Sequence, residues 1–312
     1  MKKTKQFFLG ISAFVLIFWL QSACLFSDGG AAVKSESLGD YIRLTQQEGR
    51  LQPTSLDTAI VKFVNKKTGV KVDLIGAVHI ADKEYYEALN DEFKKYDAVL
   101  FELVVNETDK NGDEKLDKRI FETKKKKNAY SDMQGSFGEF LQLSHQVDHV
   151  DYTAKNMVHA DLSLQEFLQR VSERGDIFLM LLRAAMMSLQ QSEKSASAEL
   201  ETQGRIIGSF FASNPSLSFK RSIARQMTSQ LDEAANLLAG ESSAIISDRN
   251  AAALKVLRKE IKKGTKKIAI FYGSAHLPEF VKSLKKDFKL QETEVTWLVA
   301  WDLTKNKTAR KK

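Results

Sequence analysis

The chain has 312 residues, of which 43% are hydrophobic and only three are proline, and its formal net charge is +7. This composition excludes a disordered chain and is typical of one large globular domain or two modest ones. Three of the seven charges are lysines in the first five residues, which leaves +4 on the rest of the chain. Since no recognition motif accompanies the remaining lysines, the sequence predicts no nucleic-acid binding.

The first 23 residues have the pattern of an export signal. Lysines at positions 2, 3 and 5 precede an apolar run from Phe7 to Leu20, and the small residue Ala23 follows. The run has 14 residues, fewer than the roughly 20 that span a bilayer. Residues 1–23 are therefore predicted to be a cleaved signal peptide, with an uncleaved membrane anchor as the alternative.

Cys24 is the only cysteine of the chain and directly follows the expected signal. In this position it resembles the lipidated cysteine of a bacterial lipoprotein, although Gln21 occupies the place where that motif usually has leucine. Residues 24–50 are then a lipid-anchored tether, rich in small and polar residues over 25–37. We expect an exported protein held at the bacterial cell envelope, in a leaflet that the sequence leaves open. A plain cleaved signal is the alternative.

Two similar strand–turn–helix–strand units frame residues 51–302. Both contain the turn Gly-x-x-His, as Gly76–His79 and as Gly273–His276. The predicted strands and helices of the two units are 70–77, 82–96 and 97–103, then 267–272, 278–288 and 295–300. Such units favour a mainly parallel sheet with right-handed crossovers. We predict one α/β domain.

The stretch between the two units, about 137–263, is predicted to be a helical insertion. Apolar residues recur at helical spacing over Leu164–Leu189 and over Lys220–Leu238. The pair Ser247-Asp248 is expected to cap a helix that runs to Ile261. Residues 303–312 form a basic tail.

His79 and His276 are predicted to lie where α/β proteins bind ligands, in the turns at the carboxyl ends of strands. Glu102, late in the neighbouring strand, can supply a carboxylate to the same crevice. Two imidazoles and a carboxylate are suitable ligands for a divalent metal ion of unknown identity. The alternatives are hydrogen-bonded core histidines and a Glu102 that pairs with a lysine or arginine.

With these motifs, the chain resembles the TraB family. That family includes pheromone-shutdown proteins and Tiki-type metalloproteases, and it is related to the erythromycin-esterase and ChaN-like fold. The resemblance rests on Gly76–His79, on Glu102, on Asp248-Arg249-Asn250 and on Gly273–His276, in this order over residues 60–302. It implies an α/β/α fold and, for the Tiki-type members, a divalent-metal-dependent peptidase activity.

Three further residues are candidates for the same site. Arg249 could hold a substrate carboxylate or stabilise a developing oxyanion, or it could pair with a buried acid such as Glu102. His159 and Asp161 lie in a stretch that resembles one branch of the family. They are candidate metal ligands or supporting residues, and an exposed loop is the alternative.

One tempting motif is rejected. His145 and His149 are four residues apart, as in zincin metalloproteases, but Gln146-Val147-Asp148 lies between them and the glutamate of His-Glu-x-x-His is absent.

The sequence therefore favours a metal-dependent, peptidase-like hydrolase. His79, His276 and Glu102 would hold the ion, with His159 and Asp161 as further candidates, and Glu102 is either a ligand or the general base. The alternative is a non-catalytic envelope protein that sequesters a peptide or small ligand in the same crevice. The expected partners are the membrane, through the lipid, and that ligand; the oligomeric state is left open.

We predict that Cys24→Ala abolishes acylation and lipoprotein-type processing, because the thiol is the acceptor of the lipid. Mass spectrometry of protein purified from membranes checks this, with the wild type as control. An unmodified Cys24 in the wild type, or a retained signal peptide, would contradict the lipoprotein interpretation.

Overall fold

The computed structural model describes residues 38–105, 143–174, 211–229 and 244–304, with short pieces at 110–111, 115–116, 141, 204 and 208–209. The predicted signal peptide, Cys24 and the start of the tether lie outside the described residues, as do most of the basic tail and much of the middle segment. In the part that is described, no helix combines the length and the hydrophobicity needed to cross a membrane.

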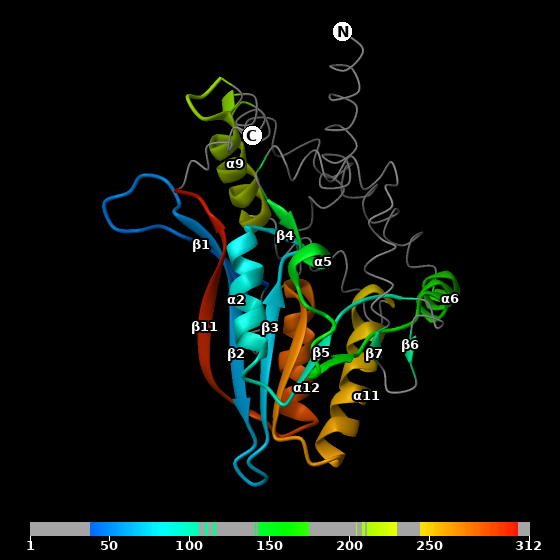
Figure 1. The fold of residues 1–312 in the computed structure, drawn as a ribbon. Coiled ribbons are helices and arrows are strands. Elements are labelled where there is room, and N and C mark those ends of the chain that lie inside the picture. The colour runs from blue at the N-terminus through cyan, green and yellow to red at the C-terminus, as the bar shows by residue number, and fades with distance from the viewer. Residues whose placement is uncertain are drawn as a thin grey trace, which may run out of the picture.

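The main sheet has seven strands within the described ranges (Figure 1). They are β1 (Ile42–Thr45), β2 (Ser55–Val64), β3 (Lys71–Ala77), β5 (Ala98–Phe101), β9 (Met157–His159), β10 (Lys267–Gly273) and β11 (Gln291–Asp302). Strands β3, β10, β5 and β9 lie side by side in this order and are parallel. Strand β2 pairs antiparallel with β1, with β3 and with β11.

The predicted α/β class with a mostly parallel central sheet is confirmed. The tertiary structure adds the strand order, in which β10 of the second unit lies between β3 and β5 of the first. The last strand of the second unit, β11, runs in the same direction as β10. It pairs with β2, which lies two strands away from β10 in the sheet. The two units are therefore interleaved, and their turns become neighbours.

Helices cover both faces of the sheet. One face packs against α2 (Lys83–Phe93), which crosses in front of the sheet in Figure 1, through Tyr85, Tyr86, Leu89 and Phe93. The other face packs against α11 (Arg249–Lys262) and α12 (Leu277–Lys286). Alternation along β10 follows this division: Ala269 and Phe271 belong to the first core cluster, and Ile268, Ile270 and Tyr272 to the second.

The middle segment is not purely helical. It supplies β9, which pairs with β5, and β8 (Ser144–His145), which pairs with β4 (Ile80–Ala81). Its described helices are α5 (Gln146–His149), α6 (Leu164–Arg174), α9 (Pro215–Ser229), η3 (Ala244–Asp248) and α11, and the remainder of both predicted helices lies outside the described residues. The other short elements are η1 (Leu38–Asp40), η4 (Ser274–His276) and the pair β6 (Lys110–Asn111) and β7 (Lys115–Leu116).

The expected capping role of Asp248 is wrong. Helix α11 continues directly from the π-helix η3, and Asp248 has helical backbone angles and makes no capping hydrogen bond. Its carboxylate is instead held by both Nε and Nη2 of Arg174, each at 2.9 Å. A paired guanidinium offers a carboxylate two charge-assisted bonds, which compete with the backbone N–H groups of a helix start.

A buried ion pair ties helix α9 to the sheet. Lys220 Nζ donates to both carboxylate oxygens of Asp82, at 2.9 and 3.0 Å, and to the carbonyl of Asp302 at 3.2 Å. Asp82 precedes α2, Asp302 ends β11, and both Lys220 and Asp82 are buried. The pair therefore joins three elements that are far apart in sequence.

We predict that Lys220→Met lowers the free energy of unfolding by about 3–5 kcal/mol, because it leaves the buried Asp82 carboxylate without this cation. Urea denaturation measures the change. Lys94→Met is the matched control: its pair with Asp91 is three-quarters exposed, so its loss should leave the free energy of unfolding almost unchanged. Equal effects of the two substitutions would contradict the structural role of Lys220.

Candidate functional site

The candidate site residues follow four neighbouring parallel strands. His79 lies two residues after β3, His276 three after β10, and Glu102 directly after β5. His159 is the last residue of β9, and Asp161 follows shortly after. Because parallel strands end at the same edge of a sheet, the topology brings these segments to one edge, as expected for an α/β fold.

Gly273, at the end of β10, marks the point around which three side chains converge. A Cβ atom added there would lie 3.3 Å from Glu102 Oε2, 3.5 Å from His79 Nε2 and 3.8 Å from His276 Cδ2. The two imidazoles are thus well within the roughly 12 Å beyond which they could not share one ion with ligand bonds of about 2 Å. Because Gly273 has no side chain, the three side chains approach one another here; a Cβ would already be in tight contact with Glu102.

The other motif glycine, Gly76, serves packing rather than ligand access. A Cβ there would lie 2.9 Å from Ser274 Oγ and 3.3 Å from the carbonyl oxygen of Ala59. Ser274 in turn donates to the carbonyl of Ala77 at 3.1 Å. The absence of a side chain at Gly76 therefore lets the turn after β10 pack closely on β3. Neither motif glycine has a positive φ.

Glu102 is a buried carboxylate held from two sides. Its Oε2 accepts a hydrogen bond of 2.6 Å from the backbone N–H of Gly273. Its Oε1 lies 2.7 Å from Arg249 Nη2 and 3.6 Å from His276 Nε2. Arg249 also donates to both oxygens of Asp161, through Nε at 3.0 Å and Nη2 at 2.5 Å. The structure therefore contains the ion pair between Arg249 and Glu102 that the sequence analysis gave as the alternative role of Arg249.

The charge of this cluster stays negative at neutral pH. Burial by itself would raise the pKa of the Glu102 carboxyl, but the neighbouring imidazole of His276 and the guanidinium of Arg249 lower it to about 2. Since His276 is uncharged at neutral pH, Arg249 is the cation that keeps Glu102 ionised there. Among the described residues, two carboxylates, Glu102 and Asp161, face one guanidinium, so this cluster favours a further positive charge.

His276 is buried and has a defined tautomer. Its Nδ1 lies 2.6 Å from Asn250 Oδ1, and Asn250 Nδ2 donates to the carbonyl of His276 at 3.3 Å. Because a carbonyl oxygen can only accept, the amide of Asn250 is oriented with its oxygen toward Nδ1, which therefore carries the proton. The Nε2 lone pair is left facing Glu102. Burial lowers the pKa of His276 to about 4, against the opposing effect of the Glu102 carboxylate.

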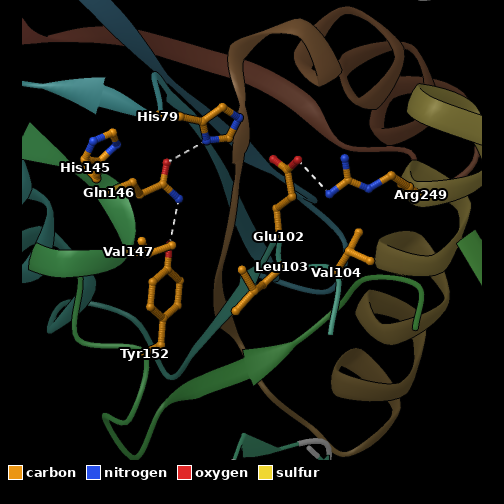
Figure 2. A pocket seen from close by; sticks show the side chains of 9 residues that line it. All are labelled: His79, Glu102, Leu103, Val104, His145, Gln146, Val147, Tyr152 and Arg249. Carbon is orange, nitrogen blue, oxygen red and sulfur yellow. Dashed lines mark hydrogen bonds and ion pairs between the residues drawn. The ribbon is translucent and has the colours of Figure 1, made fainter. Parts of the chain in front are cut away.

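His79 is exposed and lies at the mouth of a cleft of about 350 Å³ (Figure 2). Its Nδ1 is 3.1 Å from Gln146 Oε1. The cleft is lined by His79, Glu102, Leu103, Val104, His145, Gln146, Val147, Tyr152 and Arg249. It combines a largely apolar wall with the charged pair of Glu102 and Arg249, which is the usual composition of a small-molecule or peptide-side-chain site.

His159 and Asp161 are both buried, so the alternative of an exposed loop is wrong. Asp161 contacts the centre indirectly, through Arg249. His159 Nε2 forms a 2.6 Å hydrogen bond with the carbonyl of Leu103, and its ring packs edge-on against Phe101. Both residues therefore support the strand ends around Glu102 rather than lie among the converging donors.

Gln146, Tyr152 and Asn250 belong to the site but were not singled out as site residues in the sequence. Asn250 lies in a family-like motif that could have pointed to it. Tyr152 belongs to the stretch around His159 and Asp161 that resembles one branch of the family, which could likewise have pointed to it. For Gln146 no such signal exists, because its role depends on a contact with His79, 67 positions away. Of the rejected histidine pair, His145 lines the cleft and His149 stacks on Tyr86.

The imidazoles of His79 and His276 and the carboxylate of Glu102 are chemically suitable ligands for a divalent ion. Two imidazole Nε2 atoms and one carboxylate are common ligands of zinc and related ions, and all three side chains adjoin Gly273. As they stand, no three His, Cys, Asp or Glu side chains in the described ranges already have the spacing of a metal site. An ion would therefore require these side chains to draw together.

Comparison of the chain with models of known protein families and with curated proteins found no match.

We predict that the metal-free protein loses stability as the pH falls from about 6.5 to 4. The unfolded chain binds a proton at its His276 near pH 6.5, while the folded state binds it only near the lowered pKa of about 4. The free energy of unfolding should drop by about 3 kcal/mol over this window. Thermal and urea unfolding at each pH, with chelator present, measure it.

His276→Gln should flatten this part of the pH profile, because the buried titrating group is gone. His145→Gln, on the wall of the cleft, is the control and should leave the profile unchanged. A wild-type slope that survives in His276→Gln would contradict the assignment.

Proposed function

We propose that the protein is a divalent-metal-dependent, peptidase-like hydrolase of the TraB type that acts at the bacterial cell envelope. The observation that carries the proposal is the convergence of His79, His276 and Glu102 on Gly273, where no side chain separates them. These residues belong to the motifs on which the family resemblance rests. Anchoring through Cys24 is part of the same proposal and is supported by the N-terminal sequence.

The charge of the cluster supports a cation as the bound group. Within the part of the chain that the structure describes, Glu102 and Asp161 together exceed the charge of Arg249 by one negative unit, which a divalent ion would offset. An anionic cofactor would meet a carboxylate in the same space and be repelled. When bound, such an ion lowers the pKa of a water molecule and polarises a substrate carbonyl.

The lowered pKa of Glu102 favours a role as ligand over one as general base. A carboxylate with a pKa of about 2 accepts a proton poorly at neutral pH, whereas it remains available to a cation throughout the physiological range. Its two contacts, with Gly273 N–H and with Arg249, keep it in one orientation.

Arg249 has two roles in the proposed mechanism. Its guanidinium holds Glu102 and Asp161 in place, and its position in the cleft lining brings positive charge to one side of a bound substrate. A negative charge that develops on a substrate oxygen during hydrolysis would be stabilised there. The apolar wall formed by Leu103, Val104 and Val147 would bind a neighbouring apolar group of the substrate.

We predict that His79→Ala and His276→Ala each lose both bound metal and cleavage, because each removes a ligand of the ion that supplies the nucleophile. Metal content and cleavage of a peptide library are measured in parallel after reconstitution with Zn²⁺, Mn²⁺ or Co²⁺. His149→Ala, outside the converging donors, is the matched control and should retain both properties.

Arg249→Lys should reduce cleavage while sparing metal content, since an ammonium group keeps the charge but lacks the planar fork that binds carboxylates in a fixed geometry. If the reconstituted wild type cleaves nothing, yet binds a peptide equally well after both histidines are replaced, the catalytic proposal fails. A protein that sequesters a peptide or small ligand in the same cleft would then replace it.

A further inference from the structure

The segment from Leu143 to Tyr152, which we call the Gln146 segment, lies beside His79. Its strand β8 pairs with β4, so that His145 lies opposite Ile80, the residue after His79. The backbone N–H of Gln146 donates to the carbonyl of His79 at 2.9 Å. Two neighbouring backbone contacts thus align the two segments, although they are distant in sequence.

The side chain of Gln146 is buried between two rings, as Figure 2 shows. Its Oε1 lies 3.1 Å from His79 Nδ1, and its Nε2 donates to the hydroxyl of Tyr152 at 2.7 Å. Tyr152 is itself buried and packs its ring against Phe101, with centroids 4.9 Å apart. The amide is therefore held at both ends, and a core aromatic residue anchors one of them.

We infer that Gln146 is a positioning residue that sets the tautomer and the direction of His79, with Tyr152 as its anchor. An amide oxygen can only accept, so the proton of the His79 ring lies on Nδ1. The lone pair is then on Nε2, the atom that lies 3.5 Å from where a Cβ of Gly273 would be, between Glu102 and His276. Without this acceptor the ring could place its proton on Nε2 and present N–H, which repels a cation.

The second imidazole has the same arrangement, built independently. On His276 the acceptor at Nδ1 is the amide oxygen of Asn250, which comes from helix α11. In both histidines a neutral amide, rather than a carboxylate, contacts Nδ1, the ring nitrogen that would not bind the ion. Such contacts fix the orientation of a ligating histidine, and their loss typically costs 10–100-fold in metal affinity.

This inference rests on the proposed function in naming a metal ion as the group that His79 faces. The tautomer itself is a property of the metal-free protein, so it can be measured with neither metal nor substrate. Failure of the proposed function and failure of this inference are thereby distinguishable.

The first measurement is a long-range ¹H–¹⁵N NMR spectrum of metal-free protein with ¹⁵N-labelled histidine, at a pH where the imidazoles are neutral. We expect His79 in the wild type as the Nδ1–H tautomer. Gln146→Leu should convert it to a mixture or to the Nε2–H form, and Gln146→Glu, which keeps an acceptor oxygen, should restore Nδ1–H. Gln291→Leu, at the exposed start of β11, is the control and should match the wild type.

The second measurement is the dissociation constant of Zn²⁺ by competition with a chromophoric chelator. Gln146→Leu should raise it by about 10–100-fold. Gln146→Glu should have a dissociation constant near that of the wild type. Tyr152→Phe keeps the ring but removes the hydroxyl, so its dissociation constant should lie between those of the wild type and Gln146→Leu. Circular dichroism and thermal unfolding identify any variant that fails to fold, in which case Tyr152→Phe provides the decisive comparison.

An Nε2–H tautomer in the wild type, or an unchanged tautomer in Gln146→Leu, would overturn the inference whatever the metal affinity. A wild type that binds no Zn²⁺ but has Nδ1–H at His79, lost in Gln146→Leu, would refute the metal centre and uphold the role of Gln146.

Discussion

The burial of one ionised carboxylate, that of Glu102, is the constraint on which the rest of the site depends. A buried charge of this kind is stable only when its lone pairs are satisfied by donors and an opposite charge. The N–H of Gly273 and the guanidinium of Arg249 meet this need, from β10 and from helix α11. Arg249 in turn requires Asp161, which follows β9. One carboxylate therefore fixes the positions of four parts of the chain: the ends of β5 and β10, the start of α11 and the segment after β9. Loss of any of these contacts would leave a buried charge without a partner.

The two imidazoles differ in how rigidly they are held, and this difference has a functional meaning. His276 is buried, packs against Tyr272 and Phe280, and is bonded to Asn250 of a core helix. His79 is exposed on the open side of the cleft and depends on a short segment from elsewhere in the chain. One side of the centre is thus part of the core, while the other lies at the surface. In the proposed metal centre, His276 would be the ligand on the core side and His79, contacted by Gln146, the ligand on the solvent side.

The forces that stabilise the fold are largely separate from those that shape the site. The antiparallel strands β1, β2 and β11 lie on the side of the sheet away from Glu102, and there helix α9 is attached through Lys220 and Asp82. The parallel strands, whose ends carry the site, are covered by α2 on one face and by α11 and α12 on the other. Since the two regions share the sheet but not their ion pairs, substitutions in one should leave the chemistry of the other intact.

The sequence by itself determined the α/β class, the strands and helices of the two units, and the positions of His79, Glu102 and His276 at strand ends. These follow from local rules: hydrophobic periodicity marks strands and helices, and Gly-x-x-His interrupts both at the same place. Only the tertiary structure decided that β10 inserts between β3 and β5, that Asp248 pairs with Arg174 rather than capping its helix, and that Gln146 faces His79. Each of these is a contact between residues far apart in the chain. Such contacts depend on which strands and side chains meet once the core has formed, and no local pattern encodes them.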